Sequence, residues 1–159
     1  RTLAEAVLRS RDFGALRQLL SVAGENFRPA VLLKSLGEDF RVEDALAVFD
    51  CCHEKSPMLY NALLDVLISA KDIQTAERMM EKAIAAGLAD VVTYNTIIKA
   101  HALNGDVRRA RAAIETMRRA GHAPNHVTFN ELLDVQLKAD RESAWDLLAE
   151  MRVCGVPPN

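Results

Sequence analysis

The sequence predicts an all-α fold, a right-handed superhelical solenoid of stacked antiparallel helix pairs. An apolar stripe with helical spacing runs from Ile73 to Gly87, and it recurs 34 residues later and again after another 34. Self-similarity at this period is typical of helical solenoids, in which each unit buries its apolar face only against its neighbours. An alanine recurs within such stripes at intervals of 30, 31, 34 and 34 residues, at Ala15, Ala45, Ala76, Ala110 and Ala144. We expect these alanines to be buried where paired helices cross, because a small side chain there lets the axes approach.

The spacing of apolar residues and the turn residues between them predict ten helices in order. In the last three pairs, an aspartate is placed to cap the second helix, in Lys71-Asp72, Asn104-Gly105-Asp106 and Ala139-Asp140. Gly87, Gly121 and Gly155 end the last three second helices. The expected ranges are 2–9, 12–23, 29–36, 42–53, 59–70, 73–86, 92–103, 107–120, 127–138 and 141–153.

The expected organisation is one continuous solenoid. Residues 1–56 hold two shorter, divergent hairpin repeats, and residues 57–159 hold three regular repeats over 57–90, 91–125 and 126–159. The sequence begins at Arg1 rather than at a methionine, so we expect a piece of a longer protein.

The composition favours a protein that buries a continuous core and does not insert into a membrane. Half of the 159 residues are hydrophobic and 26% are charged. No uninterrupted apolar run approaches the ~18 residues of a membrane span. No carboxylate pair, nucleophile with a base, or glycine-rich phosphate loop is recognisable, so we expect neither an enzyme nor a cofactor.

The three cysteines, Cys51, Cys52 and Cys154, form neither a disulfide framework nor a zinc-ligand spacing, and they indicate a reducing compartment. We interpret Cys52 as a small core residue, since it follows the inner stripe of its helix. The adjacent His53 points about 100° away on a helix, so the two cannot converge on a metal or a substrate.

An asparagine follows an aromatic residue in the first turn of three successive first helices, as Tyr60-Asn61, Tyr94-Asn95 and Phe129-Asn130. The aromatic has a core explanation, whereas asparagine is a mediocre helix former. One interpretation is a hydrogen bond to nearby backbone within the same hairpin. The other is a ladder of amides along one face of the solenoid.

The residues resemble the 35-residue pentatricopeptide repeat. The match is most complete from Val91-Val92-Thr93-Tyr94-Asn95 through Asn104-Gly105-Asp106 and Met117-Arg118-Arg119-Ala120-Gly121 to Pro124-Asn125. The two flanking repeats match with one residue missing from a loop or turn. The tetratricopeptide repeat has the same period, but the three clear repeats lack its early tryptophan and Leu-Gly pair. The single Trp145 lies in a second helix, and we expect it to pack rather than to stack on a ligand.

The resemblance implies binding of single-stranded RNA, one base per repeat, read by the fifth and last residues of each repeat. The reading pairs here are Asn61 with Asp90, Asn95 with Asn125, and Asn130 with Asn159. The family's pairing tendencies imply U at the first pair, a pyrimidine with cytosine favoured at the second, and a pyrimidine at the third. The second residues, Met58, Val92 and Val127, would by the same resemblance clamp the base faces, although each taken alone fits a core position better than a clamp. Of the family's thirteenth-position lysines for the RNA backbone, only Lys138 is present.

The charge of the chain does not favour RNA binding by itself, since Lys and Arg number 20 against 22 Asp and Glu. The middle repeat is basic, but its arginines lie on the second helix, where a solvated surface is the plain interpretation. They are Arg108, Arg109, Arg111, Arg118 and Arg119.

Two functions therefore stay open. The first is sequence-selective RNA binding in the processing, stability or translation of transcripts in a mitochondrion or plastid, a location that the family resemblance implies. The second is a protein-interaction scaffold for subunits of a larger assembly, such as an organellar ribosome.

Overall fold

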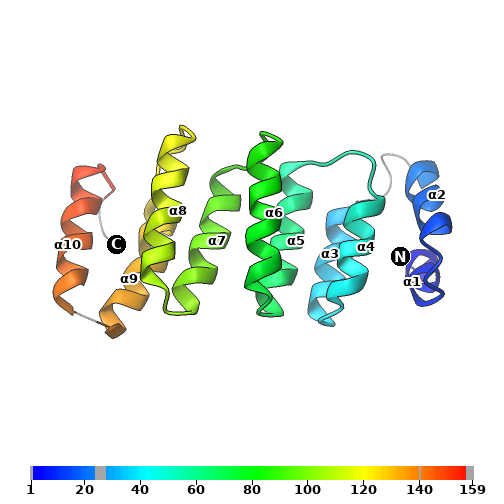
Figure 1. The fold of residues 1–159 in the computed structure, drawn as a ribbon, viewed down its shortest axis with the longest axis horizontal. Coiled ribbons are helices and arrows are strands. Elements are labelled where there is room, and N and C mark those ends of the chain that lie inside the picture. The colour runs from blue at the N-terminus through cyan, green and yellow to red at the C-terminus, as the bar shows by residue number, and fades with distance from the viewer. Residues whose placement is uncertain (1, 24–27, 140, 157–159) are drawn as a thin grey trace. The chain divides into compact units, whose positions relative to one another are not determined.

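The computed structural model describes residues 2–23, 28–139 and 141–156, and these residues form ten α-helices without a strand (Figure 1). The all-α class predicted from the sequence is confirmed. The helices are α1 (Thr2–Arg9), α2 (Phe13–Ala23), α3 (Pro29–Glu38), α4 (Val42–Cys51), α5 (Pro57–Ser69), α6 (Ile73–Ala85), α7 (Val91–Leu103), α8 (Val107–Arg119), α9 (His126–Ala139) and α10 (Arg141–Val153).

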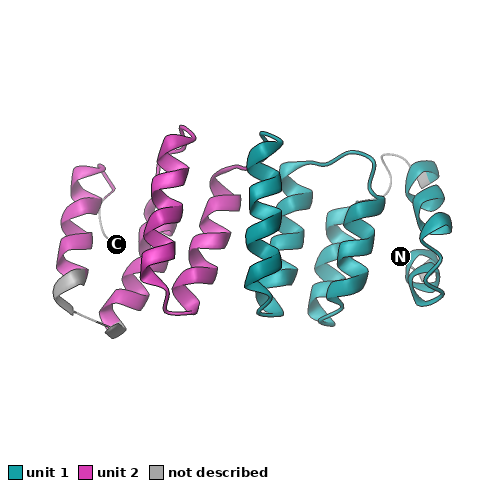
Figure 2. Ribbon diagram, viewed as in Figure 1, with its two compact units in different colours: residues 1–88 teal, residues 89–159 magenta. Residues whose placement is uncertain are grey.

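The chain divides into two compact units, residues 1–88 and residues 89–159 (Figure 2). The boundary lies in the loop before α7, next to the expected end of the first regular repeat. The repeat boundaries and the single continuous solenoid stay predictions. Among the described helices, none combines the length and apolar character that crossing a bilayer requires.

In the first unit, sequential helices pair as hairpins, and the first helices α3 and α5 also pack against each other. The leucines of these two helices are fully or nearly fully buried, because apolar positions three and four residues apart share one helix face. Gly37 is required at this contact, since a Cβ there would lie 2.9 Å from a methyl group of Val66. The core of the unit includes Leu33, Leu36, Ala45, Val48, Leu63, Leu64, Leu67 and Ala76.

In the second unit, α7 pairs with α8 and α9 with α10, and α9 packs against both helices of the preceding hairpin. The aromatic residues of the two first helices are central to this core, as the sequence predicts. Tyr94 and Phe129 are both buried, and burial raises the pKa of Tyr94 above its ordinary value. The rest of the core includes Ile98, Ala110, Met117, Leu132, Ala144, Leu147 and Met151.

The alanine column is buried at four of its five positions, Ala45, Ala76, Ala110 and Ala144. Ala15 is only half-buried, so the expectation is wrong there. In the α1–α2 hairpin the neighbouring Leu16 is fully buried instead, and the small buried residue is Ala4 on the first helix. The hairpin therefore packs with a different register.

The helix ends follow the predicted caps. The Asp72 and Asp106 carboxylates accept hydrogen bonds from the backbone N–H groups of Thr75 and Arg109, at 3.1 and 2.9 Å, so they cap α6 and α8. Asp140 lies outside the described residues. The three glycines that end α6, α8 and α10 have φ values of 67°, 83° and 71°, a conformation that residues with a Cβ rarely adopt.

A left-handed residue also sits in the tight turn of the first four hairpins. It is a glycine only at Gly105, and the other three are Arg11, Phe40 and Lys71, with φ values of 54°, 54° and 61°. Because a Cβ is unfavourable in this region, each of the three turns is strained.

Cys52 is buried, and the core role predicted for it is confirmed. Burial raises the pKa of its thiol, with Lys55 acting in the opposite direction. Its helix ends at Cys51, two residues earlier than expected, because Cys52 is already extended. Trp145 contradicts its expectation, since it is 71% exposed on α10 and does not pack into the core.

Candidate nucleic-acid interface

The first helices of the three regular repeats each expose one stripe of side chains, which we call the reading stripe. It consists of the second, fifth, ninth and thirteenth residues of the repeat, which share one face because they are spaced by three or four residues. Every described side chain in it is exposed or half-buried. The stripe comprises Met58, Asn61, Asp65 and Ser69 on α5, Val92, Asn95, Lys99 and Leu103 on α7, and Val127, Asn130 and Asp134 on α9.

The apolar residues at the start of each stripe lie outside the core. Met58, Val92 and Val127 are 71%, 56% and 40% exposed. The core interpretation left open by the sequence is therefore wrong for all three. Each lies one helical turn before an asparagine of the stripe, on the same face.

The last residues of the first two regular repeats have a structural role that their sequence did not suggest, because each caps the first helix of the next repeat. Asp90 caps α7, where its carboxylate accepts from the backbone N–H of Thr93 at 2.8 Å. Asn125 precedes α9 in the same way, and its Oδ1 accepts from the backbone N–H groups of Val127 and Thr128 at 3.0 and 3.2 Å. The proposed readers are thus fixed by the backbone of a helix.

The capping is reciprocal in both repeats. The Thr93 hydroxyl accepts a hydrogen bond from the Asp90 backbone N–H at 3.0 Å, and the Thr128 hydroxyl accepts from that of Asn125 at 3.1 Å. A threonine three residues after an aspartate or asparagine, just before an apolar run, is the sequence signal that could have revealed these boxes.

Asn95 and Asn125, expected to form the second reading pair, lie side by side although 30 residues separate them. Asn95 Nδ2 donates a long hydrogen bond of 3.5 Å to Asn125 Oδ1. Asn95 Oδ1 accepts a short one of 2.6 Å from the hydroxyl of Thr128. Asn95 therefore bonds to side chains at the start of α9 and not to the backbone of its own hairpin.

Asn61 lies in the first unit, beside a groove between α3 and α5 of about 730 Å³. Met58 and Asp65 line the same groove, together with Ala30 and Val31 of α3. The reading stripe of α5 therefore borders a hollow surface. Asp90, expected to pair with Asn61, belongs to the second unit.

The third predicted pair is described only in part. Asn130 is exposed on α9, whereas Asn159 lies outside the described residues, as does the side chain of Lys138. Lys99, which the sequence analysis did not select, is an exposed lysine of the reading stripe, four residues after Asn95. Its spacing from Asn95 is the signal that could have identified it.

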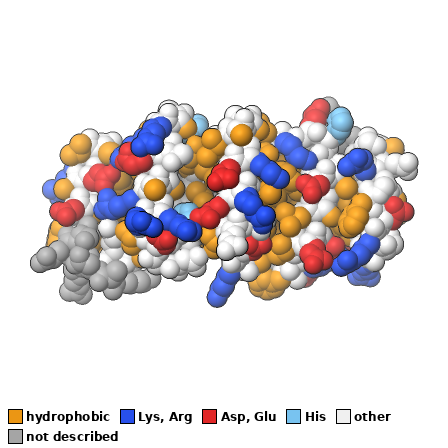
Figure 3. Space-filling view, viewed as in Figure 1, with side chains coloured by type: hydrophobic (Ala, Val, Ile, Leu, Met, Phe, Trp, Pro, Cys, Tyr) orange, Lys and Arg blue, Asp and Glu red, His pale blue; other side chains and the backbone are white. Residues whose placement is uncertain are grey.

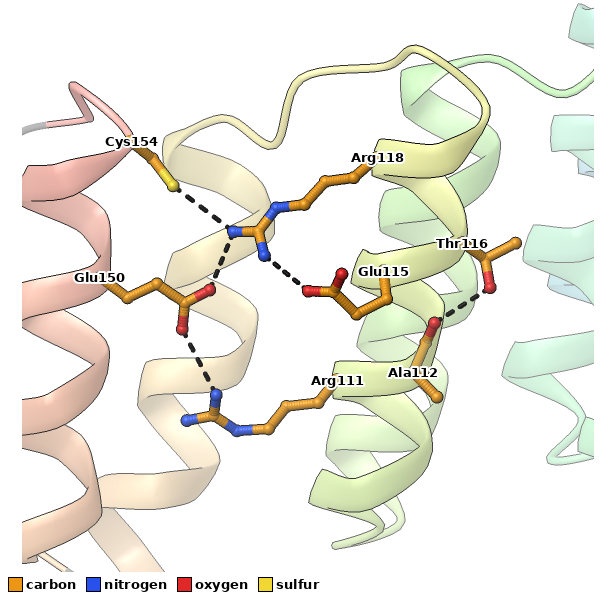
Figure 4. A network of polar contacts seen from close by, with 7 residues as sticks. All are labelled: Arg111, Ala112, Glu115, Thr116, Arg118, Glu150 and Cys154. Carbon is orange, nitrogen blue, oxygen red and sulfur yellow. Dashed lines mark hydrogen bonds and ion pairs between the residues drawn. The ribbon is translucent and has the colours of Figure 1, made fainter.

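The arginines of the middle repeat are partly engaged in ion pairs between second helices (Figure 4). Glu150 of α10 accepts from Arg111 at 3.3 Å and from Arg118 at 2.8 Å, and Arg118 also pairs with Glu115 at 2.6 Å. The hydrogen bond to Glu150 is the main reason why the pKa of Arg118 is raised. Figure 3 shows basic and acidic side chains interspersed over α6 and over α8. These contacts agree with the solvated-surface interpretation.

Comparison with known protein families identifies the family of this chain. A model of the PPR repeat family matches residues 89–138, and a PPR repeat model matches residues 58–88. Together the matches span just over half of the chain. The chain belongs to the pentatricopeptide repeat family.

Individual relatives support this assignment. A pentatricopeptide repeat-containing protein of Arabidopsis thaliana is 29% identical over 107 residues, which cover 64% of this chain and 19% of the relative. The chloroplastic pentatricopeptide repeat-containing protein 10 of Zea mays is 39% identical over 74 residues, 44% of this chain and 9% of the relative.

Solved structures of similar proteins have the same fold as this chain. The crystal structure of PPR10 in complex with an 18-nt psaJ RNA element is 29% identical, with a TM-score of 0.72, over 98% of this chain and 25% of that one. The structure of PPR10 from maize, 24% identical with a TM-score of 0.69, covers 99% of this chain. The fold is therefore that of an all-α helical repeat superhelix. The chain spans a quarter or less of the length of these proteins.

Proposed function

We propose that this chain binds single-stranded RNA in a base-selective manner, with one base per repeat facing the reading stripe. The observation that carries the proposal is the Asn95–Asn125 pair, in which two half-buried side-chain amides converge near the start of neighbouring first helices. The likeness to PPR10, whose structure is known in complex with an RNA element, supports the same ligand class. Binding rather than catalysis is the activity that such a surface performs.

The hydrogen-bonding capacity of the pair favours a pyrimidine with adjacent acceptors. The Oδ1 atoms of Asn95 and Asn125 already accept intramolecular hydrogen bonds, so the pair offers mainly N–H donors to a ligand. Cytosine presents two adjacent acceptors, N3 and O2, on its Watson–Crick edge. We therefore assign cytosine to this position. For Asn61 and Asp90, the family's pairing tendencies imply U.

The exposed apolar residues would hold the base faces. Met58, Val92 and Val127 each leave apolar surface in water beside a candidate reader. An unstacked base offers an apolar face to such a side chain, so contact would remove apolar surface of both from water. Such contact does not depend on which base the RNA presents, so it would add affinity without selectivity.

Contact with the RNA backbone falls to lysines of the first helices rather than to the arginines. Lys99 and Lys138 belong to the ninth and thirteenth positions of the reading stripe, whereas Arg111 and Arg118 are paired with Glu150. With so few lysines, the affinity should be modest and should fall with increasing salt. We assign the protein to a mitochondrion or plastid, in the processing, stability or translation of transcripts, since the relatives include a chloroplastic protein.

Filter binding at fixed salt tests the proposal. The chain should prefer pyrimidine-rich single-stranded RNA over purine-rich RNA and over a duplex. Asn61→Thr should move the preference at the first position from U toward G, by the family's pairing rule. Arg109→Ala on α8 is the control, and it should leave base preference unchanged. Equal weak binding to every RNA, unaffected by Asn61→Thr, would instead favour a scaffold for protein subunits.

A further inference from the structure

Thr128 is a buried residue that contacts both members of the second reading pair. It is the third residue of α9, and its side chain is fully buried. Its hydroxyl accepts from the Asn125 backbone N–H at 3.1 Å and donates to Asn95 Oδ1 at 2.6 Å. One buried hydroxyl therefore links both members of the second reading pair.

The surrounding contacts decide which end of the Asn95 amide faces outward. Asn125 Oδ1 is turned toward the helix because it accepts two backbone N–H groups of α9. The Asn95 atom that approaches Asn125 Oδ1 must be nitrogen, since two carbonyl oxygens would repel each other. The oxygen of Asn95 then faces Thr128, at a distance typical of an O–H···O bond.

We propose that Thr128 is a positioning residue for base selection, which locks the Asn95 amide with its oxygen turned inward and its nitrogen available to the base. The inference rests on the proposed RNA-binding function and adds a third residue to the reading pair. Without the hydroxyl, only the long 3.5 Å contact to Asn125 would orient the amide. The amide could then rotate and offer its oxygen as an acceptor to the N3–H of uracil, so it would accommodate uracil as well as cytosine.

The experiment compares Thr128→Val, which keeps the shape but removes the hydroxyl, with Thr128→Ser, which keeps the hydroxyl. Fluorescence anisotropy at one salt concentration measures binding to an oligo(U) nonamer with and without a single central cytosine. The wild-type chain should bind the cytosine-containing RNA about five-fold more tightly or better. Thr128→Val should bring this ratio close to one, and Thr128→Ser should preserve it.

A control variant separates positioning from helix capping, because Thr128 also belongs to the cap of α9. Asp106→Ala removes the cap of α8, where Asp106 accepts from the Arg109 backbone N–H, and it touches neither reader. It should lower the melting temperature comparably to Thr128→Val and leave the cytosine ratio unchanged. If Thr128→Val does not fold, Thr128→Ala is measured in the same way.

The outcomes distinguish this inference from the function on which it rests. A wild-type preference for cytosine that survives Thr128→Val would overturn the positioning role alone. A wild-type chain without any preference among single-stranded RNAs would overturn the proposed function as well. Loss of preference in both Thr128→Val and Asp106→Ala would assign the effect to helix stability and also refute the positioning role.

Discussion

Replacing Asn125 by aspartate should change the base that the second repeat selects without weakening the fold. The cap of α9 needs one acceptor oxygen for the N–H groups of Val127 and Thr128, and a carboxylate supplies it as well as an amide does. A negative charge at a helix N-terminus is favourable by about 0.3–1 kcal/mol. The melting temperature of Asn125→Asp should therefore stay the same or rise slightly.

The effect on recognition should be much larger. The substitution exchanges the Nδ2 donor of Asn125 for an acceptor, which would meet an acceptor of cytosine but a donor, N3–H, of uracil. A mismatched edge contact costs about 1–3 kcal/mol, so the ratio of cytosine to uracil affinity should fall by about 5- to 150-fold. The Asp90–Thr93 box shows that this fold accommodates the carboxylate, since the Thr93 hydroxyl donates to Asp90 Oδ1 at 2.8 Å.

Competition binding with cytosine- and uracil-containing oligonucleotides measures the ratio at fixed salt. Asp106→Asn is the matched control, because it makes the reverse exchange at the cap of α8, away from the readers. It should alter overall affinity through its charge and leave the ratio unchanged. An unaltered ratio in Asn125→Asp, with a normal melting temperature, would refute the assignment of Asn125 as a reader.

Three further predictions concern the fold. Lys71→Gly should raise the free energy of unfolding by about 0.5–1 kcal/mol in chemical denaturation, because Lys71 has a left-handed φ of 61°. Gly105→Ala should lower it by about 1 kcal/mol through the same backbone strain, although a Cβ there meets no atom within 4 Å. Ala110→Leu should lower the free energy of unfolding by about 1–3 kcal/mol through overpacking, and with it the melting temperature. Ala112→Leu on the exposed face of the same helix should change both little. A thiol reagent should label Cys154 quickly and the two buried cysteines only after denaturant is added; rapid labelling of all three would contradict the packing of α4.

The sequence by itself determined the features that depend on neighbouring residues. The helices were placed to within two residues by apolar periodicity, the Asp72 and Asp106 caps and the glycines that end three helices. A helix and its caps are formed by contacts over one or two turns, so neighbouring residues suffice to predict them. The buried aromatic next to each candidate reader followed from the same periodicity. The resemblance to the pentatricopeptide repeat then indicated which asparagines to pair.

Only the tertiary structure determined which residues are neighbours in space and which side chains are exposed to solvent. Asn95 meets Asn125 and Thr128 because α7 packs against α9, a contact between residues about 30 apart that no local pattern encodes. Packing also left Met58 and Trp145 exposed, although each is apolar enough for a core. A hydrophobic residue on a helix is buried only where a neighbouring element covers its face, and the stacking of the hairpins determines which faces are covered.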